Sequence, residues 1–302
     1  MAGMQHDPVE TTEACYRHPT QSTRVHCTRC GRPICPDCMI PAPVGFQCPE
    51  CVQLARREFR QARPGVARLG LGQGRLTATN LLLLAMGVMF VVEILAGGPN
   101  AALDGPTGQR LYDLGALYPP AIASGQYWRL FSAMFLHLGL IHIAFNAYAL
   151  WLFGQFAERT FGSLVFLLIF FVTGFLASAT SYAFGPPLIL GAGASGAIFG
   201  VFGAFVAYNY RRRHLAMAAA NLRWAVMLIV LNAVLAFGWS GIDWRAHVGG
   251  LLAGFAAGFV AEGVGSDQVR RLVRILGFAA LIGVGVALVM TRTADLRSLM
   301  GP

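Results

Sequence analysis

The sequence predicts an all-α polytopic membrane protein: a six-helix bundle followed by a seventh, C-terminal transmembrane helix and preceded by a small zinc-stabilised domain. Three observations support this fold class. The 302 residues are 56% hydrophobic and only 12% charged, whereas soluble domains are typically ~25% charged. Long apolar runs recur between residues 79 and 290, and all seven cysteines lie within residues 15–51. The composition excludes a water-soluble single domain.

Seven apolar segments are long enough to cross a hydrocarbon core of about 30 Å, and Arg, Pro or Gly-rich breaks separate them. We predict transmembrane helices over residues 79–96, 137–156, 163–184, 194–210, 222–239, 246–263 and 272–290. The residues before the first span lack the apolar core of a signal peptide and carry all the cysteines. We therefore expect the N-terminus to lie in the reducing cytoplasm.

Arginine provides all 23 basic residues, and its distribution among the loops predicts the orientation. With the N-terminus inside, 14 of the 19 arginines from residue 56 onward lie on the cytoplasmic side and 5 on the other. Because basic residues favour cytoplasmic loops, this asymmetry supports a multi-pass protein with a cytoplasmic N-terminus. We expect it to lie in the plasma membrane, with the lipid bilayer as its partner. The asymmetry also explains the net charge of +9 without nucleic acid, which we do not expect as a partner. The absence of Lys favours a GC-rich bacterial genome.

The loop at residues 97–136 is too long to be a simple connection. It holds four prolines and then Tyr127, Trp128 and Arg129, a mixture suited to a structured segment in the membrane interface. A disordered extracellular loop that ends in an interfacial aromatic residue fits the sequence equally well.

Four polar residues occur where a structural membrane helix would avoid them. His142 and Asn146 are four residues apart, and hence on one face, near the start of the second span. Ser195 opens the fourth span and His247 opens the sixth. Because these three spans all run from outside to inside, their N-terminal ends lie at the same depth in the outer half of the bilayer. The four side chains can therefore converge.

Glycines on the fourth and sixth spans permit the close approach that proton transfer needs. They recur at Gly196, Gly200 and Gly203, and at Gly250, Gly254 and Gly258. This spacing lets two membrane helices pack backbone to backbone, so we expect Ser195 Oγ within ~3 Å of His247, the reach of a nucleophile and its base. Two other interpretations stay open: the glycines and the serine serve packing alone, or the polar residues line the path of a transporter.

These motifs resemble those of the rhomboid family of intramembrane serine proteases, which implies a rhomboid-like six-helix bundle. The resemblance covers about residues 76–290 and depends on Trp128-Arg129, His142-x-x-x-Asn146, Gly193-x-Ser195-Gly196 and Ala246-His247-x-Gly249-Gly250-x-x-x-Gly254, in the family's order. His137, Phe153-Gly154 and Glu158 match further family positions. Many relatives place a Tyr four residues after the serine, whereas this chain has Phe199, which keeps the ring face and loses only a hydroxyl.

The resemblance implies a serine endopeptidase that hydrolyses peptide bonds in or near transmembrane segments of membrane-protein substrates, with an active site that opens to the outer side. Ser195 would attack the scissile carbonyl and His247 would accept its proton, with no aspartate and no cofactor for catalysis. The Ser195 backbone N–H and the side chains of His142 and Asn146 would hold the oxyanion. A transporter and a catalytically inactive rhomboid-like protein are the alternatives.

The cysteine-rich head contains four ligand pairs: Cys15-x-x-His18, Cys27-x-x-Cys30, Cys35-x-x-Cys38 and Cys48-x-x-Cys51. Eight ligands fit two tetrahedral, structural Zn²⁺ ions with none left over, whereas a thioredoxin-like role for one pair would leave three pairs unexplained. The head resembles a B-box zinc finger, which implies that the first and third pairs share one ion and the second and fourth share the other. Sequential pairing stays open. So short a segment has little core, and we expect metal binding to supply its folding energy.

These features divide the chain into a cytoplasmic zinc-binding domain at 1–55, an Arg-rich linker at 56–75, a six-helix catalytic core at 76–265, and the seventh span with a short tail at 266–302. We expect the head to bind a protein partner or to regulate the core. All zinc ligands precede Arg56 and all catalytic candidates follow Tyr127, so we also expect the two parts to be independent.

Overall fold

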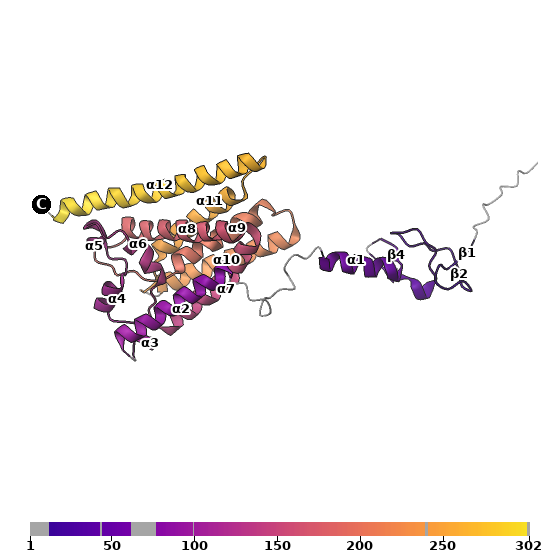
Figure 1. Cartoon of the computed structure of the whole chain (residues 1–302), viewed down its shortest axis with the longest axis horizontal. Helices are drawn as coiled ribbons and strands as arrows, with labels where there is room; N and C mark the ends of the chain where they lie inside the picture. The colour runs from indigo at the N-terminus through magenta and orange to yellow at the C-terminus, as the bar shows by residue number, and fades with distance from the viewer. Residues whose placement is uncertain (1–11, 43, 62–76, 99, 239–240, 301–302) are drawn as a thin grey trace, which may run out of the picture. The chain divides into compact units, whose positions relative to one another are not determined.

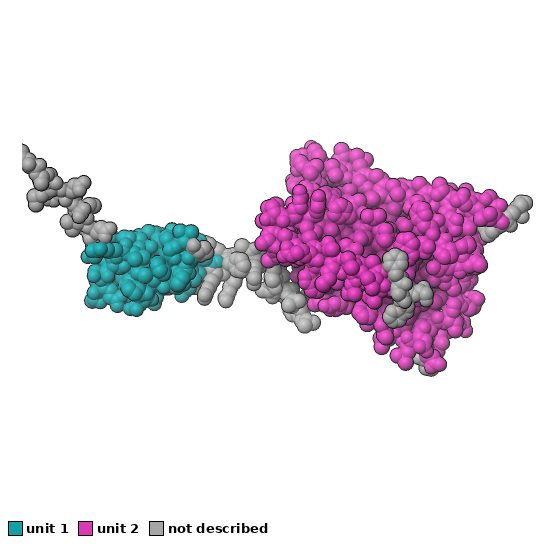
Figure 2. Space-filling model, turned by 180° about the vertical axis from the view of Figure 1, so that it is seen from behind, with its two compact units in different colours: residues 1–74 teal, residues 75–302 magenta. Residues whose placement is uncertain are grey.

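A computed structural model of the chain describes residues 12–42, 44–61, 77–98, 100–238 and 241–300 (Figure 1). The chain divides into two compact units, Met1–Gly74 and Arg75–Pro302, which Figure 2 shows in different colours. Most of the predicted Arg-rich linker at 56–75 lies outside the described residues. Its first six residues belong to a helix that begins in the cysteine-rich head.

The first unit is built from two β-hairpins, a 3₁₀ turn and a helix. Strand β1 (Glu13–Ala14) pairs antiparallel with β2 (Ser22–Thr23), and β3 (Ile40–Pro41) pairs antiparallel with β4 (Phe46–Gln47). The 3₁₀ turn η1 spans Pro36–Cys38, and α1 spans Pro49–Gln61. The buried core consists of Ile34 and six cysteines, so sulfur atoms occupy the place of a hydrocarbon core.

Among its described residues, the second unit is a bundle of seven long helices, one for each predicted span. They are α2 (Ala78–Gly97), α7 (Leu140–Phe161), α8 (Ser163–Phe184), α9 (Ser195–Arg211), α10 (Ala216–Gly238), α11 (Trp244–Glu262) and α12 (Asp267–Met300). By length and composition, five of them can cross a membrane; in the described part of the chain, α9 and α11 fall outside that set. The all-α polytopic fold is thus confirmed.

The predicted helix ends differ from the observed ones where polar or glycine residues set the boundary. α7 begins after Gly139, whose φ of 90° is incompatible with a helix, rather than at His137. α12 continues beyond its apolar segment in both directions through polar turns. Hydropathy marks only the apolar part of such a helix, so it cannot locate these ends.

α9 and α11 pack in backbone contact. A Cβ on Gly250 would lie 2.0 Å from the carbonyl oxygen of Gly196, and a Cβ on Gly254 would lie 1.8 Å from that of Gly200. No side chain fits in so small a space. The predicted glycine contact is therefore confirmed, and it holds the N-terminal ends of α9 and α11 together.

Glu158 connects three helices at the end of α7 that is far from His142. Its carboxylate accepts the backbone N–H groups of Ala78 at 2.7 Å and Thr79 at 2.9 Å. It also accepts the hydroxyls of Thr79 at 2.7 Å and Ser163 at 2.8 Å. A carboxylate satisfies the free N–H groups at the start of a helix and interacts favourably with its dipole, so Glu158 fixes α2 and α8 against α7.

Residues 100–139, which lie between α2 and α7, are ordered. They contain α3 (Ala101–Asp104), α4 (Gly108–Leu114), α5 (Pro119–Ala123), α6 (Arg129–Ser132) and the 3₁₀ turn η2 (Ala133–Phe135). The buried Arg129 guanidinium donates to the carbonyl oxygens of Tyr112 at 2.7 Å and Ala116 at 3.1 Å. It also donates to the Gln126 side chain at 2.8 Å. The expectation of a structured segment is confirmed, and the disordered alternative is wrong.

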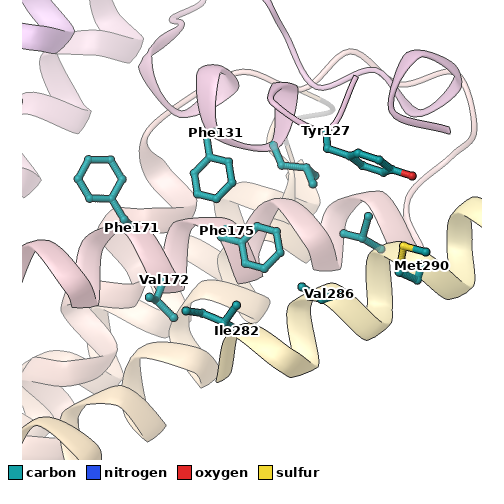
Figure 3. A pocket seen from close by; sticks show the side chains of 10 residues that line it. Tyr127, Phe131, Phe171, Val172, Phe175, Ile282, Val286 and Met290 are labelled. Carbon is teal, nitrogen blue, oxygen red and sulfur yellow. The ribbon is translucent and has the colours of Figure 1, made fainter. Parts of the chain in front are cut away.

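An apolar pocket of about 450 Å³ lies between the segment around α6, α8 and α12 (Figure 3). Phe131 and Phe175, whose stacked rings have centroids 5.4 Å apart, both line it, and Ile282 lines the α12 side. No predicted site residue is among the described residues that line it. The pocket is therefore separate from the predicted active site.

Candidate active site

Ser195 and His247 meet at the N-terminal ends of α9 and α11. Ser195 is the first residue of α9, and its Oγ lies 2.9 Å from His247 Nε2. Phe199, one turn further along α9, stacks on the His247 ring with centroids 4.4 Å apart and planes inclined by 16°. The serine hydroxyl can thus donate to the imidazole, and the aromatic ring that replaces the family's usual Tyr holds the imidazole plane.

The other nitrogen of His247 contacts a residue that the sequence analysis did not single out. Nδ1 lies 3.0 Å from Oδ1 of Asn232, which belongs to α10. An amide oxygen only accepts hydrogen bonds, so Nδ1 carries the proton and Nε2 is free to accept from Ser195. The position of Asn232 within an apolar span is the sequence signal that could have identified it, because polar residues in spans face the bundle interior or a cavity.

His142 approaches the serine from α7. Its Nδ1 accepts the backbone N–H of Leu138 at 3.1 Å, so the ring proton is on Nε2. A Cβ on Gly193 would lie 2.9 Å from that Nε2 and 3.7 Å from Ser195 Oγ. The φ of Gly193 is 135°, which also favours glycine. Glycine at this position therefore allows an imidazole N–H donor to come close to the serine.

Asn146 lies one turn after His142 on the same face of α7. Only 5% of its surface is exposed, and its Nδ2 is buried without a hydrogen-bond partner among the described residues. A buried donor without an acceptor costs about 1–3 kcal/mol, and such groups are few in folded proteins. The Asn146 amide is therefore available to an oxygen that arrives with substrate or water.

The N-terminus of α9 offers a further donor. Its N-cap residue, Ala194, makes no side-chain capping bond. The first N–H groups of a helix have no acceptor within the helix, and its dipole favours negative charge at this end. α11 differs, because the Asp243 carboxylate accepts the backbone N–H groups of Arg245 at 3.1 Å and Ala246 at 3.2 Å. Of these two helices, α9 is the one whose N-terminus makes no side-chain capping bond and is open to an anion.

Comparison with known proteins identifies the family of this chain. The family model for the Rhomboid domain matches residues 124–262, which include all four predicted catalytic residues. The chain is 32% identical over 143 residues to the "Putative rhomboid protease YdcA" of Bacillus subtilis (strain 168), covering 47% of this chain and 71% of YdcA. The chain belongs to the rhomboid family.

Two further rhomboid relatives match over part of their length. The chain is 37% identical to Rhomboid protease GluP of Bacillus subtilis (strain 168) over 245 residues, which are 78% of this chain and 46% of GluP. It is 36% identical to Rhomboid-like protease 1 of Toxoplasma gondii over 162 residues, which are 51% of this chain and 54% of that protein. The chain thus spans about half the length of these two rhomboid proteins.

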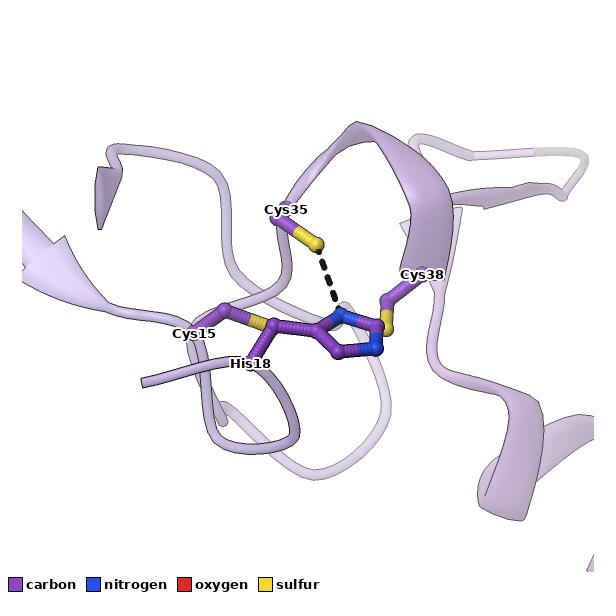
Figure 4. A group of neighbouring side chains, drawn as sticks. All are labelled: Cys15, His18, Cys35 and Cys38. Carbon is purple, nitrogen blue, oxygen red and sulfur yellow. Dashed lines mark hydrogen bonds between the residues drawn. The ribbon is translucent and has the colours of Figure 1, made fainter. Parts of the chain in front are cut away.

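The eight predicted zinc ligands lie before the Rhomboid domain match and form two groups. One group is Cys15, His18, Cys35 and Cys38 (Figure 4), and the other is Cys27, Cys30, Cys48 and Cys51. Within each group, one ligand atom per residue lies within 4.8 Å of all the others. The ligands are thus grouped in the interleaved order that the B-box resemblance implies, not in sequential order.

The distances within these groups fit zinc. His18 Nδ1 lies 3.2 Å from Cys35 Sγ and 3.5 Å from Cys38 Sγ, so Nδ1 is the nitrogen that faces the site. The sulfur atoms of Cys30 and Cys48 are 3.8 Å apart. Two sulfurs bound at ~2.3 Å to one tetrahedral ion would be separated by ~3.8 Å.

The acidity of the thiols in the first group also fits a cation site. Burial raises the pKa of the Cys15 thiol, but the backbone N–H groups of Arg17, Cys35 and His18 outweigh burial and lower this pKa to about 6. Burial, together with the neighbouring Cys15 and Cys35 thiols, raises the pKa of Cys38 to about 11. The lowered pKa favours the thiolate form of Cys15, and a bound cation would favour the thiolate form of Cys38 as well.

Proposed function

We propose that this rhomboid-family protein is an intramembrane serine endopeptidase in which Ser195 is the nucleophile and His247 the general base. The contact of 2.9 Å between Ser195 Oγ and His247 Nε2 carries the proposal. A hydrogen bond of this length is what proton transfer from a serine to its base requires. The substrates would be membrane proteins, cleaved in or near their transmembrane segments.

In this mechanism Ser195 Oγ attacks the scissile carbonyl carbon while His247 Nε2 takes the hydroxyl proton. The Ser195 N–H, His142 Nε2–H and Asn146 Nδ2–H donate to the oxyanion, and one such donor is typically worth ~3 kcal/mol. His247 then protonates the leaving amine as the C–N bond breaks, which leaves an acyl-enzyme. Water attacks the ester carbonyl as His247 removes its proton; the ester bond breaks, and the returned proton restores Ser195.

The length of α9 supports an active site below the outer membrane surface. Its 17 residues span ~26 Å, less than the ~30 Å of a hydrocarbon core. Arg211 and Arg212, at its C-terminal end, form ion pairs with Glu262. If these arginines mark the cytoplasmic interface, Ser195 lies within the outer half of the membrane. The arginine distribution supports the same orientation, with a cytoplasmic N-terminus in a plasma membrane.

The space beside the nucleophile supports a preference for small residues at the cleaved bond. A cavity of about 40 Å³ borders Ser195 and is lined mostly by small residues, among them Gly174, Ala177 and Gly193. A large side chain would not fit. We therefore expect a small residue at the cleaved bond. The rhomboid resemblance further implies substrates whose transmembrane helices carry small or helix-destabilising residues near the outer interface.

The head would bind two structural Zn²⁺ ions, one in each interleaved ligand group, and catalysis would need no cofactor. The ligand distances and the buried thiols support this part of the proposal. Because sulfur atoms form the core of this unit, metal binding would supply its folding energy. Its role would be to bind a protein partner or to regulate the rhomboid unit.

Cleavage of a single-span substrate by the purified protein in liposomes tests the enzymatic proposal. The native chain should cleave, Ser195→Ala and His247→Ala should not, and Ser298→Ala, which changes an exposed serine of α12, should cleave normally. Cleavage that persists in Ser195→Ala would overturn the assignment. Solute flux by a native chain that cleaves nothing would favour the transporter, and neither activity would favour an inactive rhomboid-like protein.

A further inference from the structure

The mechanism with Ser195 and His247 requires a particular protonation state of the His247 ring. A histidine that accepts a proton from serine must be neutral, with Nε2 unprotonated. Its remaining proton is then on Nδ1, where it needs an acceptor. Asn232 Oδ1 is that acceptor, at 3.0 Å.

The nearest carboxylate does not serve this purpose. Asp243 lies one turn before His247, but its side chain accepts the backbone N–H groups of Arg245 and Ala246 and the hydroxyl of Ser181. In the described part of the chain, the Asp243 carboxylate makes no hydrogen bond to the His247 ring. The carboxylate therefore caps α11, and an amide from a different helix orients the imidazole.

We propose that Asn232 is a positioning residue that keeps His247 in its base form by accepting the Nδ1 proton. This inference deepens the proposed function and depends on it. Phe199 holds the plane of the ring, and Asn232 fixes which nitrogen carries the proton. Loss of the hydrogen bond that holds the base histidine in its correct tautomer can greatly reduce the rate of a serine protease.

Because Asn232 lies on α10, the tautomer of His247 depends on the position of this helix. This helix packs mainly against α9, and most of its apolar side chains are exposed, among them Val226, Val230 and Val234. His247, the general base on α11, is thus oriented by a residue of α10, a helix that is itself weakly packed. α10 must be docked for His247 to hold the correct tautomer.

Asn221 provides a matched control on the same helix. Its side chain donates to Asn209 Oδ1 at 2.8 Å, so it also makes a hydrogen bond to a neighbouring helix, but not to His247. We would compare Asn232→Leu, which removes the acceptor at similar volume, Asn232→Asp, which keeps an acceptor, and Asn221→Leu. The measurements are kcat, KM and the thermal midpoint, with ¹⁵N-histidine NMR to report the tautomer. His247→Gln assigns the His247 signal among the 7 histidines.

For Asn232→Leu we expect kcat to fall about 10- to 100-fold with KM unchanged, the range typical when a partner that orients a functional histidine is lost. The NMR signal should show that the His247 proton is no longer confined to Nδ1. Asn232→Asp should retain most of kcat and the Nδ1–H tautomer, and Asn221→Leu should keep both while its thermal midpoint falls.

An unchanged tautomer and unchanged kcat in Asn232→Leu would overturn the proposal. Equal losses of kcat in Asn232→Leu and Asn221→Leu would also overturn it, because they would show a general effect of α10 packing. The NMR comparison does not depend on proteolysis. If the native chain cleaves nothing, the protease proposal fails, while the tautomer in Asn232→Leu still decides the role of Asn232.

Discussion

Asn146→Ala separates a role in catalysis from a role in folding. Asn146 is buried, with 5% of its surface exposed, yet its Nδ2 donates to no described residue. A structural asparagine would show the opposite arrangement, with its amide hydrogen bonds already made in the folded state. We therefore expect the substitution to affect the reaction far more than the stability.

The magnitudes follow from these contacts. If Nδ2 donates to the oxyanion, its loss should cost about 2.7–4 kcal/mol in the transition state, or 10²- to 10³-fold in kcat, with little change in KM. Stability should change by less than ~1 kcal/mol, because no hydrogen bond of the folded state is broken and an unpaired buried donor is removed.

Asn209→Ala is the matched control, because Asn209 is also buried but its side-chain amide already makes hydrogen bonds in the folded state. Its Nδ2 donates to Phe205 O at 2.8 Å, and its Oδ1 accepts from Asn221 at 2.8 Å. At ~0.5–1.5 kcal/mol per hydrogen bond, its loss should lower stability by about 1–3 kcal/mol and leave kcat nearly unchanged. Turnover and thermal unfolding would be measured on the same detergent preparation of each variant. Unchanged kcat in a folded Asn146→Ala protein, or a parallel loss of activity and thermal midpoint, would refute the oxyanion role.

Two further predictions concern helix packing and the head. Gly254→Ala would place a Cβ 1.8 Å from the Gly200 carbonyl oxygen, so it should lower stability by about 1–3 kcal/mol in thermal unfolding. Gly283→Ala is the control, because its Cβ would have no atom within 4 Å, and it should leave stability unchanged. Equal thermal midpoints of the two variants would contradict the backbone contact. Cys27→Ser should reduce the metal content from two zinc ions to one and disorder the head. A fragment of residues ~70–302, which lacks the head, should still cleave substrate. Loss of cleavage on removing the head would show that the two parts are not independent.

The sequence was sufficient for the features that depend on the order and direction of apolar helices. Seven apolar runs placed the seven long helices, and their alternating direction placed Ser195, His247 and His142 at the same end of the bundle. The repeated glycines predicted the contact of α9 with α11, because only small residues allow two backbones to touch. Each of these inferences uses information that is local in the chain.

The features that the sequence did not predict depend on contacts between distant residues. Arg129 was recognised as part of a motif, but its hydrogen bonds to the carbonyls of Tyr112 and Ala116, which order the segment around α4 to α6, appear only in the fold. Asn232 is one polar residue in an apolar run, and nothing in its local sequence indicates that it faces His247. The strands of the hairpins in the head have two residues each, which is too short for an alternation of apolar and polar residues to be visible in the sequence.

The central claim is that Ser195 is a nucleophile activated by His247, and covalent labelling tests it most directly. Detergent-solubilised native protein would be treated with a serine-reactive fluorophosphonate probe, and the modified residue identified by peptide mass spectrometry, with a zinc chelator as a control. We predict a single label on Ser195 that is lost in His247→Ala and unaffected by the chelator. Labelling of Ser195 that is equally fast in His247→Ala, or no labelling of Ser195 in a protein that cleaves substrate, would contradict the claim.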